Sequence, residues 1–562
     1  MMEHRSKAYT REEFNKVLRE FHKQSSRHVL IVEADISHVN KCAIFHYADL
    51  LRKAGNELTA VMKKKLDQLT RTKKYRSILD DYNKYKKNDN KKMKSLKGKE
   101  LKALQEDNDI TFDFCRKTMI EINKRYGLHS AHALARAEDI WKGVEKCLYS
   151  NGKTLRFKKR FDLPSIRAKQ INRGIVAKYN DNDIYFSFDS YTKNKTISKK
   201  KTSKIDIHLT KDIDRFQSDE LNAILDYLKD PEYHDHIAVR HFDETVECIS
   251  TYRPCYAALV CKTIRGRMRV FVHITVEGKA VPKYDSKGNL RHKKSTGIVG
   301  VDIGTQHYAY VSDEKDGIDT LGDLDDNFKK QQQKEKRLNR KMDRQRRANN
   351  PQNYNNDCTV KKRRKRWHNS NRYKKTLSKY KEQCRKNAVN RKYANNHKVN
   401  LLRELGDIVI TEPKNWSKLQ KKVKKTKKND QGKYQRKKRS GRSLLKCNPG
   451  YFQEQLEKVF PVYIEVSKQY RASQYDHTAD DYIKKKLSQR KYELYDGTEV
   501  QRDWYSAFLL YNYDFQTQVI DKPKCCNKFK KHHERLKSII EDIKKRGIKI
   551  NNSGIRIYQQ NN

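Results

Sequence analysis

The excess of positive charge is the feature that most restricts how this chain can fold. Its 562 residues contain 127 Lys and Arg against 70 Asp and Glu, which gives a formal net charge of +57. A folded chain with such a surplus repels itself unless a polyanion neutralises part of the charge. Nucleic acid is the usual polyanion for such a chain, so we expect it as a partner. The alternative is a soluble basic protein with no dedicated partner.

An anionic membrane surface is the other polyanion to consider. No stretch of the sequence approaches the roughly 20 apolar residues that a membrane span requires, and Met1–Glu20 has no apolar signal core. We therefore expect no membrane partner and a cytoplasmic, nucleoid-associated protein of a bacterium or phage. The 11 cysteines are scattered and odd in number, so we expect reduced thiols.

The pattern of apolar and polar residues changes twice along the sequence, from helical to strand-like spacing and then to a mixture of both. Because the chain is also too long for one compact domain, we predict an α+β multidomain protein. Residues 1–150 are predicted to be a mainly helical region, most clearly at Ser130–Cys147. Residues 151–296 contain short alternating segments that predict a β-rich domain resembling a small barrel, interrupted by a helix near Ser218–Leu228.

Residues 297–562 form the third predicted domain. It begins with GIVGVDIGTQHYAYVSD, which predicts a buried strand, a tight turn and a second strand. A long basic stretch at about 325–405 has almost no Gly or Pro and predicts a helical insert. Further strands are predicted before Glu412 and at Val462–Val466, and a helix at Val500–Leu510.

Three carboxylates stand where this pattern predicts a strand, a strand end or the start of a helix. Asp302 lies inside the first apolar strand, Glu412 follows a second, and Asp503 begins an amphipathic helix. Buried carboxylates are costly unless they are paired or bind a metal. If these three converge, they make an oxygen-rich site suited to two Mg²⁺ or Mn²⁺ ions, which can clamp the two oxygens of a phosphodiester displacement. For each acid alone, the alternative is a salt-bridged or helix-capping residue.

These segments resemble the RuvC motifs of TnpB, the RNA-guided nuclease of insertion sequences, and of the related type V CRISPR effectors. GIVGVDIGTQHYAYVSD resembles the first motif, DIVITEPKNW the second, and VQRDWYSAFLL the third, with Asp302, Glu412 and Asp503 at the catalytic positions. VYIEVSKQYRASQ resembles the strand after the second motif. LRFKKRFDLPSIRAK and IRGRMRVFVHITVEGKAVP are similar to the wedge β-domain that precedes RuvC, so the resemblance covers roughly residues 150–515.

The resemblance implies an RNase H-like RuvC nuclease domain behind an N-terminal recognition region and a wedge domain. It implies an RNA-guided DNA endonuclease with a single active site, where Asp302 and Asp503 each hold a metal ion and Glu412 completes the pair. The implied partners are a guide RNA transcribed near the gene and a double-stranded DNA target. The protein would read a short flanking motif while RNA pairing reads the sequence. We favour a monomer.

This sequence departs from the TnpB pattern in the segment that usually binds zinc. Most TnpB-like proteins have a zinc ribbon made of CxxC pairs between the second and third motifs, whereas Cys447 is the only cysteine between Glu412 and Asp503 here. Four-coordinate zinc cannot be built from one cysteine, so we expect a zinc-less loop at about 473–500, which resembles a ribbon-less branch of the group. Cys525-Cys526 and His532-His533 do not change this expectation, because adjacent cysteines are poor co-ligands.

Other basic and aromatic side chains are candidates for nucleic-acid binding. A dense basic block suits a phosphate backbone, with the tryptophan after it stacking on a base. An arginine beside the third acid is placed to touch the scissile phosphate, and a histidine in the zinc-less loop to contact DNA or assist proton transfer. For each, the alternative is an ordinary surface residue. The residues are Lys361, Lys362, Arg363, Arg364, Lys365, Arg366, Trp367, Arg502 and His477.

Three other functions fit part of the sequence. A nuclease-inactive RNA-guided DNA-binding protein or repressor typically lacks the acids, and all three are present here. A DDE-type transposase also has an RNase H-like fold and three acids, but the wedge-like module before Asp302 favours the TnpB group. GVDIGT also occurs in the phosphate loop of sugar kinases, but we find no second Gly-rich phosphate loop among the 21 glycines.

Overall fold

The computed structural model divides the chain into two compact units, Met1–Asn289 and Leu290–Asn562, and each is described by itself. Both contain helices and strands, which confirms the expected multidomain protein of mixed secondary structure. The structure describes residues 9–88, 90–149, 152, 154–160, 162–168, 172–190, 204–243, 250–292, 294–322, 326–363, 365–420, 431–432, 441–467, 469–485, 489–547 and 550–556.

An eight-stranded antiparallel sheet forms the centre of the first unit. Its strand order is β2-β7-β8-β1-β6-β5-β4-β3, and β4 also approaches β7, so the sheet curls into a half-barrel. This curl agrees with the barrel-like β-domain that we expected. The strands are β1 (Arg27–Asp35), β2 (Ile166–Arg167), β3 (Asn172–Arg173), β4 (Ile175–Asn180), β5 (Asp183–Asp189), β6 (Lys204–Leu209), β7 (Pro254–Ile264) and β8 (Arg267–Glu277).

The place of β1 corrects the expected division at residue 150. β1 lies between β8 and β6 in the middle of the sheet, with Leu30 paired to Ile274 and Ala34 to Leu209. Leu30 and Val32 are buried in the same core as the N-terminal helices. The N-terminal region and the β-domain are therefore one compact unit.

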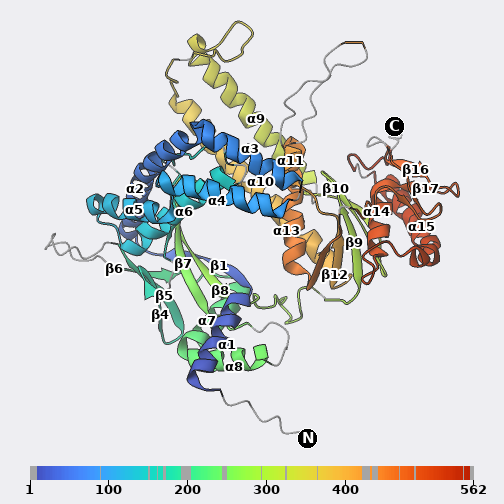
Figure 1. The fold of residues 1–562 in the computed structure, drawn as a ribbon, viewed down its shortest axis with the longest axis horizontal. Helices are drawn as coiled ribbons and strands as arrows, with labels where there is room; N and C mark the ends of the chain where they lie inside the picture. Colours follow the sequence, from blue (N-terminus) through green and yellow to red (C-terminus); the bar gives the residue numbers. More distant parts are fainter. Residues whose placement is uncertain are drawn as a thin grey trace. The chain divides into compact units, whose positions relative to one another are not determined.

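The helices of the first unit agree with the prediction that the N-terminal region is mainly helical. α2 is the longest, starts after the Ser37 cap and ends at Arg71, and the side chain of the next residue, Thr72, caps α3. It packs against α5 and α6 (Figure 1). The predicted helices at Ser130–Cys147 and Ser218–Leu228 are confirmed as α6 and α7. The helices are α1 (Arg11–Gln24), α2 (His38–Arg71), α3 (Lys73–Lys87), α4 (Lys91–Asp107), α5 (Phe112–Tyr126), α6 (Ser130–Tyr149), α7 (Arg215–Lys229) and α8 (Pro231–Asp243).

A five-stranded mixed sheet forms the centre of the second unit. Its order is β11-β10-β9-β12-β13. β9, β10 and β11 are antiparallel neighbours, whereas β12 is parallel to both β9 and β13. The apolar run before Glu412 and the segment from Gly297 form strands as predicted. The bounds are β9 (Ile298–Ile303), β10 (His307–Ser312), β11 (Gly317–Thr320), β12 (Ile408–Thr411) and β13 (Val462–Glu465).

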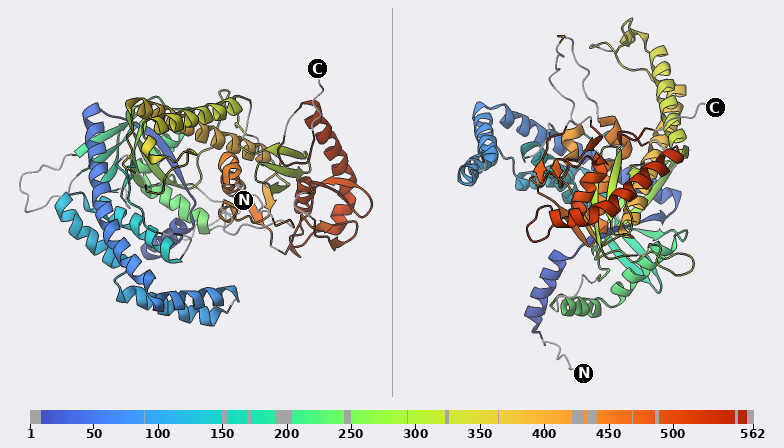
Figure 2. Two further views of the ribbon diagram at one scale, coloured as in Figure 1. Left: turned by 90° about the horizontal axis from the view of Figure 1, so that it is seen from above. Right: turned by 90° about the vertical axis from the view of Figure 1, so that its right-hand side faces the viewer.

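Helices and short strands complete the second unit. The predicted basic insert consists of two long helices, α9 and α10, which lie side by side (Figure 2). In the part of the chain that the structure describes, no helix combines the length and apolar composition needed to cross a bilayer. The elements are α9 (Asp326–Ala348), η1 (Pro351–Asn353), α10 (Asn371–Arg403), α11 (Trp416–Gln420), α12 (Gly441–Cys447), α13 (Pro449–Val459), β14 (Tyr475–Asp476), β15 (Asp481–Tyr482), β16 (Lys491–Glu493), β17 (Glu499–Gln501), α14 (Arg502–Tyr511) and α15 (Lys522–Lys545).

α14 is buried on all sides, although the sequence suggested an amphipathic helix with one apolar stripe. Every residue from Asp503 to Tyr511 is buried. Trp504, Ala507 and Leu510 fill the faces between the predicted stripe positions, and a helix that is apolar all round belongs in a protein core. Asp503 is therefore held on a fixed element.

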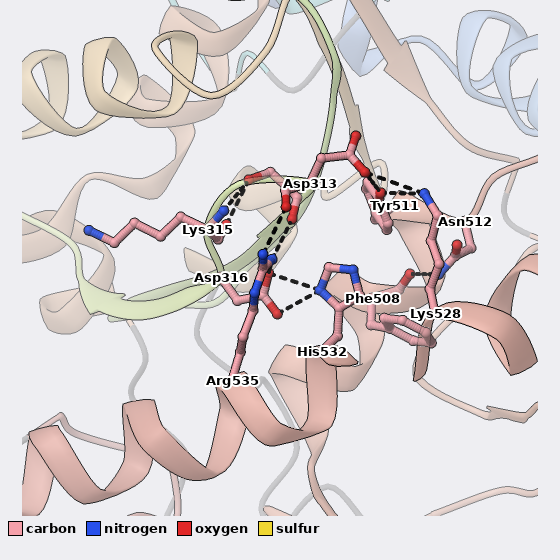
Figure 3. A network of polar contacts seen from close by, with 10 residues as sticks. Asp313, Lys315, Asp316, Phe508, Tyr511, Asn512, Lys528, His532 and Arg535 are labelled. Atoms are coloured by element: carbon pink, nitrogen blue, oxygen red, sulfur yellow. Dashed lines mark hydrogen bonds and ion pairs between the residues drawn. The ribbon is translucent and has the colours of Figure 1, made fainter. Parts of the chain in front are cut away.

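A polar network ties α15 and the end of α14 to the turn between β10 and β11 (Figure 3). The buried Asp316 carboxylate lies 2.9 Å from Nδ1 of His532 and 3.4 Å from Nη1 of Arg535. Arg535 also donates to the carbonyl of Asp313 at 2.9 Å, and the Asp313 carboxylate accepts a hydrogen bond from the Tyr511 hydroxyl. These contacts fix both helices on the sheet.

Candidate active site

Asp302 and Glu412 stand at the same end of two neighbouring strands. β9 and β12 are parallel, with Ile410 paired to Gly300 and Thr411 to Val301. One residue further along this register, Glu412 comes beside Asp302. The carboxyl ends of two parallel strands thus bring together two acids that are far apart in the sequence.

α14 brings Asp503 to the same end of the sheet. The helix packs so closely on β9 that a Cβ at Gly300 would lie 2.3 Å from the carbonyl oxygen of Ala507. Asp503 is one helical turn before Ala507, and Asp302 is two residues after Gly300. Asp503 also lies near enough for its charge to act on Lys414, which contacts Asp302.

Lys414 is the positively charged group that the three acids share. Its Nζ donates to Oδ1 of Asp302 and, at 2.6 Å, to the carbonyl of Ile303. Burial alone would lower the pKa of Lys414, but the negative charges of Asp302, Glu412 and Asp503 raise it above its usual value. The described side chains contain no group of three or more His, Cys, Asp or Glu that is positioned to hold a metal ion.

The pKa of Asp503 is lowered by several partners. Burial would raise it, but His307 Nε2 lies 2.8 Å from Oδ2 and, with Arg490 and Arg502, favours the ionised form. Gln501 Nε2 donates to the same oxygen at 3.3 Å. Asp503 is therefore a carboxylate with a fixed orientation.

The pKa of Glu412 is shifted in the opposite direction. Burial and the adjacent charge of Asp302 raise it, and the positive charges of Lys414 and Arg502 offset only part of that rise. A further cation near Glu412 and Asp302 would relieve this repulsion. The sequence-predicted Arg502 acts electrostatically on Glu412 and Asp503, so its guanidinium belongs to this site.

Lys414 and His307 were not predicted from the sequence. Lys414 follows Glu412 by two residues, and a lysine a few residues after an apolar strand is a weak signal in so basic a chain. His307 starts β10, and its other ring nitrogen, Nδ1, lies 3.1 Å from the carbonyl oxygen of Asn551. The contacts of Lys414 and His307 with the acids are both made between residues that are far apart in the sequence.

The predicted zinc-less loop forms two small hairpins, β14–β15 and β16–β17, within its described residues. Asp476, in β14, is buried and accepts hydrogen bonds from the backbone of Thr478 in its own hairpin at 3.0 Å and of Tyr495 in the other hairpin at 3.1 Å. Burial would raise the pKa of Asp476, but these hydrogen bonds lower it below its ordinary value. One carboxylate therefore joins two parts of the loop.

The position of His477 corrects the role expected for it. Its side chain is buried, and Nδ1 lies 2.7 Å from the hydroxyl of Tyr505. The ring also packs against Phe508 and Phe529. An imidazole enclosed in an aromatic cluster has no exposed edge for DNA, so His477 is a core residue that connects the loop to α14.

The basic block lies on an ordered loop between α9 and α10. Asn353 is fully buried and forms a pair of hydrogen bonds with the backbone of Lys365, at 2.7 and 3.1 Å. Asn350 makes an equivalent pair with His368. Arg364 lies outside the described residues. The exposed members of the block are Lys361, Lys362, Arg363, Lys365 and Arg366.

Trp367 follows the block and is half-buried. The guanidinium carbon of Arg346 lies 3.9 Å from the centre of its ring, and Tyr354 meets it edge-on at 5.8 Å. One face of the indole is thus covered by an arginine, so that face is not available to stack on a base.

Comparisons with known proteins give only distant similarities, all of them to solved structures. No family model matches the chain, and no curated protein matches it either. Among solved structures, the chain is similar to the crystal structure of the selenomethionine-derived Cas12i1 R-loop complex before target DNA cleavage, with a TM-score of 0.24 and 9% sequence identity. The match covers 78% of this chain but only 58% of the Cas12i1 chain, which is less than two thirds of that protein. A similarity at this level does not establish a family.

Proposed function

We propose that this protein is an RNA-guided DNA endonuclease, and that Asp302, Glu412 and Asp503 form the active site that cleaves the DNA. The observation that carries the proposal is that β9, β12 and α14 bring three acids to one end of the sheet, where Asp302 contacts Lys414 and the charges of Glu412 and Asp503 act on it. The mixed five-stranded sheet beneath them, three antiparallel strands followed by two parallel ones, supports an RNase H-like RuvC domain. The resemblance of all three segments to RuvC motifs supports the same assignment.

The donor set fits hard divalent cations. Asp302, Glu412 and Asp503 offer only carboxylate oxygens, which Mg²⁺ and Mn²⁺ prefer. The repulsion that raises the pKa of Glu412 is the kind that a bound cation removes. When bound by these three residues, two such ions would activate the attacking water and stabilise the leaving oxygen of a phosphodiester.

Other residues of the site have roles that follow from their contacts. His307, Gln501 and Arg490 hold Asp503 in one orientation and keep it ionised. Arg502 acts electrostatically on Glu412 and Asp503, and a positive charge near these acids would favour a scissile phosphate.

The charge of the chain supports a guide RNA and a DNA target as partners. A net charge of +57 is far more than a single active site requires, and a long nucleic acid can neutralise it. RNA pairing would read the target sequence, while the protein reads a short flanking motif. The resemblance to the TnpB group supports this division of labour.

The experiment that tests the function is to express the protein with its native flanking DNA and to sequence the RNA that copurifies. A discrete RNA that ends in a variable guide, together with Mg²⁺-dependent cutting of a DNA matching that guide, would support the proposal. A smear of cellular RNA would remove the guide from it. A discrete RNA with target binding but no cutting would favour the second candidate, a nuclease-inactive RNA-guided binder, in which the ion pair of Asp302 with Lys414 is a permanent structural contact.

Neutralising the basic block is expected to weaken nucleic-acid binding and to flatten its salt dependence. Each lost phosphate contact should reduce the slope of log K against log salt by about 0.7–0.9. The binding constant is measured over a salt series for the variant in which Lys361, Lys362, Arg363, Lys365 and Arg366 are replaced by Gln.

A second variant with the same charge change serves as the control for the basic block. It replaces five exposed lysines of α15 by Gln, and its salt slope should stay close to that of the wild type. Equal slopes for both variants would mean that the block contributes only to the general field of the protein. The control residues are Lys530, Lys531, Lys537, Lys544 and Lys545.

A further inference from the structure

We propose that Lys414 is a resident cation of the three-acid site, which holds the acids together before metal ions bind and has to leave Asp302 to admit them. This inference rests on the proposed function, because it assumes that the same acids bind metal. It adds a control step to that function: the site exchanges its own ammonium group for the metal ions.

The contacts of Lys414 are those of a cation in a ligand site. Its Nζ donates to Oδ1 of Asp302 and to the carbonyl oxygen of Ile303, both of them oxygens at the end of β9. Glu412 and Asp503 act on the same ammonium through their charges. A metal ion that took Oδ1 of Asp302 as a ligand would compete with this ammonium for the same oxygen.

The chain around Lys414 allows the exchange. Lys414 lies between the end of β12 at Thr411 and the start of α11 at Trp416, so moving its side chain breaks no helical or strand hydrogen bond. The side chain is 24% exposed, against 8% for that of Asp302. A lysine stem is long and flexible, so the ammonium can swing to solvent or to a phosphate of a bound nucleic acid.

The balance of charge at the site favours replacement of the Lys414 ammonium by divalent metal ions. Three carboxylates at one end of the sheet, with one ammonium in contact with Asp302, leave an excess of negative charge that repels the acids from each other. Divalent ions neutralise this excess more completely than one ammonium does. Without metal, removing the ammonium would take from Asp302 the cation that it contacts directly.

The first test measures Mn²⁺ binding to the full-length protein by electron paramagnetic resonance, without nucleic acid and at neutral pH. Lys414→Met keeps the length of the side chain and removes its charge, so it should bind Mn²⁺ about tenfold more tightly than the wild type, which corresponds to about 1.4 kcal/mol. Lys414→Arg keeps the charge and should bind Mn²⁺ as weakly as the wild type does. Equal or weaker Mn²⁺ binding by Lys414→Met would overturn the inference.

The same assay separates this inference from the proposed function. Asp302→Asn should remove most of the Mn²⁺ binding whatever Lys414 does. If Asp302→Asn bound Mn²⁺ as the wild type does, the three acids would not be the metal site, and the proposed function would fail. If only the Lys414→Met prediction failed, the metal site would stand and Lys414 would be a permanent partner of Asp302.

A second measurement uses the wild-type protein and does not depend on the folding of any variant. An amine-acetylating reagent followed by mass spectrometry reports how accessible each lysine is. Lys414 should react several-fold faster when Mg²⁺ is present, while the exposed Lys418 on α11 should react at the same rate in both conditions. A Lys414 rate that Mg²⁺ leaves unchanged would contradict the exchange.

Discussion

Asp302→Asn is expected to reduce the rate of DNA cleavage by a factor on the order of 1,000 or more, while RNA and DNA binding stay close to the wild type. The amide has nearly the shape of the carboxylate but lacks its charge, so it cannot help to hold divalent ions. Binding should persist because Asp302→Asn leaves unchanged the basic side chains that we propose to contact phosphate, including the basic block and Arg502. Single-turnover cleavage and equilibrium binding are measured on the same preparations.

Asp319→Asn is the matched control for this prediction. Asp319 lies on β11 of the same sheet and also pairs with a lysine, Lys398, at 2.6 Å, but it is not one of the three acids. Its replacement should leave the cleavage rate within a small factor of the wild type. Cleavage that survived in Asp302→Asn would place the chemistry elsewhere, and loss of RNA binding would mean that Asp302 has more than a catalytic role.

The sequence predicted the elements that carry the three acids because each acid adjoins a dense apolar segment. Ile298–Ile303 and Ile408–Thr411 are buried strands whose apolar runs are recognisable without a structure. The helix at Asp503 was recognised from its aromatic and leucine residues. Its burial on all sides was not, because a stripe pattern does not show what covers the other faces.

The polar partners in the site could not be predicted in the same way. The pairing of His307 with Asp503 and of Lys414 with Asp302 depends on which strands become neighbours, and no local period of the sequence contains that information. In a chain with 127 basic residues, one lysine or histidine carries little signal by itself. The structure identifies them because only tertiary packing decides which cation meets which acid.

Two errors in the sequence-based description have a common cause. β1 lies among helices in the sequence, so its strand pattern was overlooked, and only its pairing with β8 and β6 shows where it belongs. His477 lies in a loop and was expected to be exposed, but Tyr505 and Phe529 enclose it. In both cases, long-range contacts override what the neighbouring residues suggest.

Gly300→Ala is expected to destabilise the second unit by about 3 kcal/mol and to reduce cleavage by about 100-fold at temperatures where the protein is still folded. A Cβ at this position would lie 2.3 Å from the carbonyl oxygen of Ala507 and 2.4 Å from the amide nitrogen of Tyr511. Both are backbone atoms of α14, so no side chain can rotate away. The helix must move off β9, and Asp503 moves with it.

Gly98→Ala is the control for adding a methyl group at a glycine. Gly98 lies in α4, and its new Cβ would meet only Tyr82 Cε2, at 3.7 Å, which is an ordinary contact. Alanine is the better helix former, so this variant should be as stable as the wild type or more stable by up to about 1 kcal/mol. Its cleavage rate should not change.

Comparing stability with cleavage in Gly300→Ala separates two explanations for lost activity. If the variant cut normally wherever it was folded, the close approach of α14 to β9 would matter for stability alone, and the position of Asp503 would tolerate a shift. If cleavage fell while the folded fraction stayed high, and Mn²⁺ binding weakened in parallel, the loss would come from the moved carboxylate. We expect the second result, because Asp503 lies on α14, and α14 can pack closely on β9 only because residue 300 is a glycine.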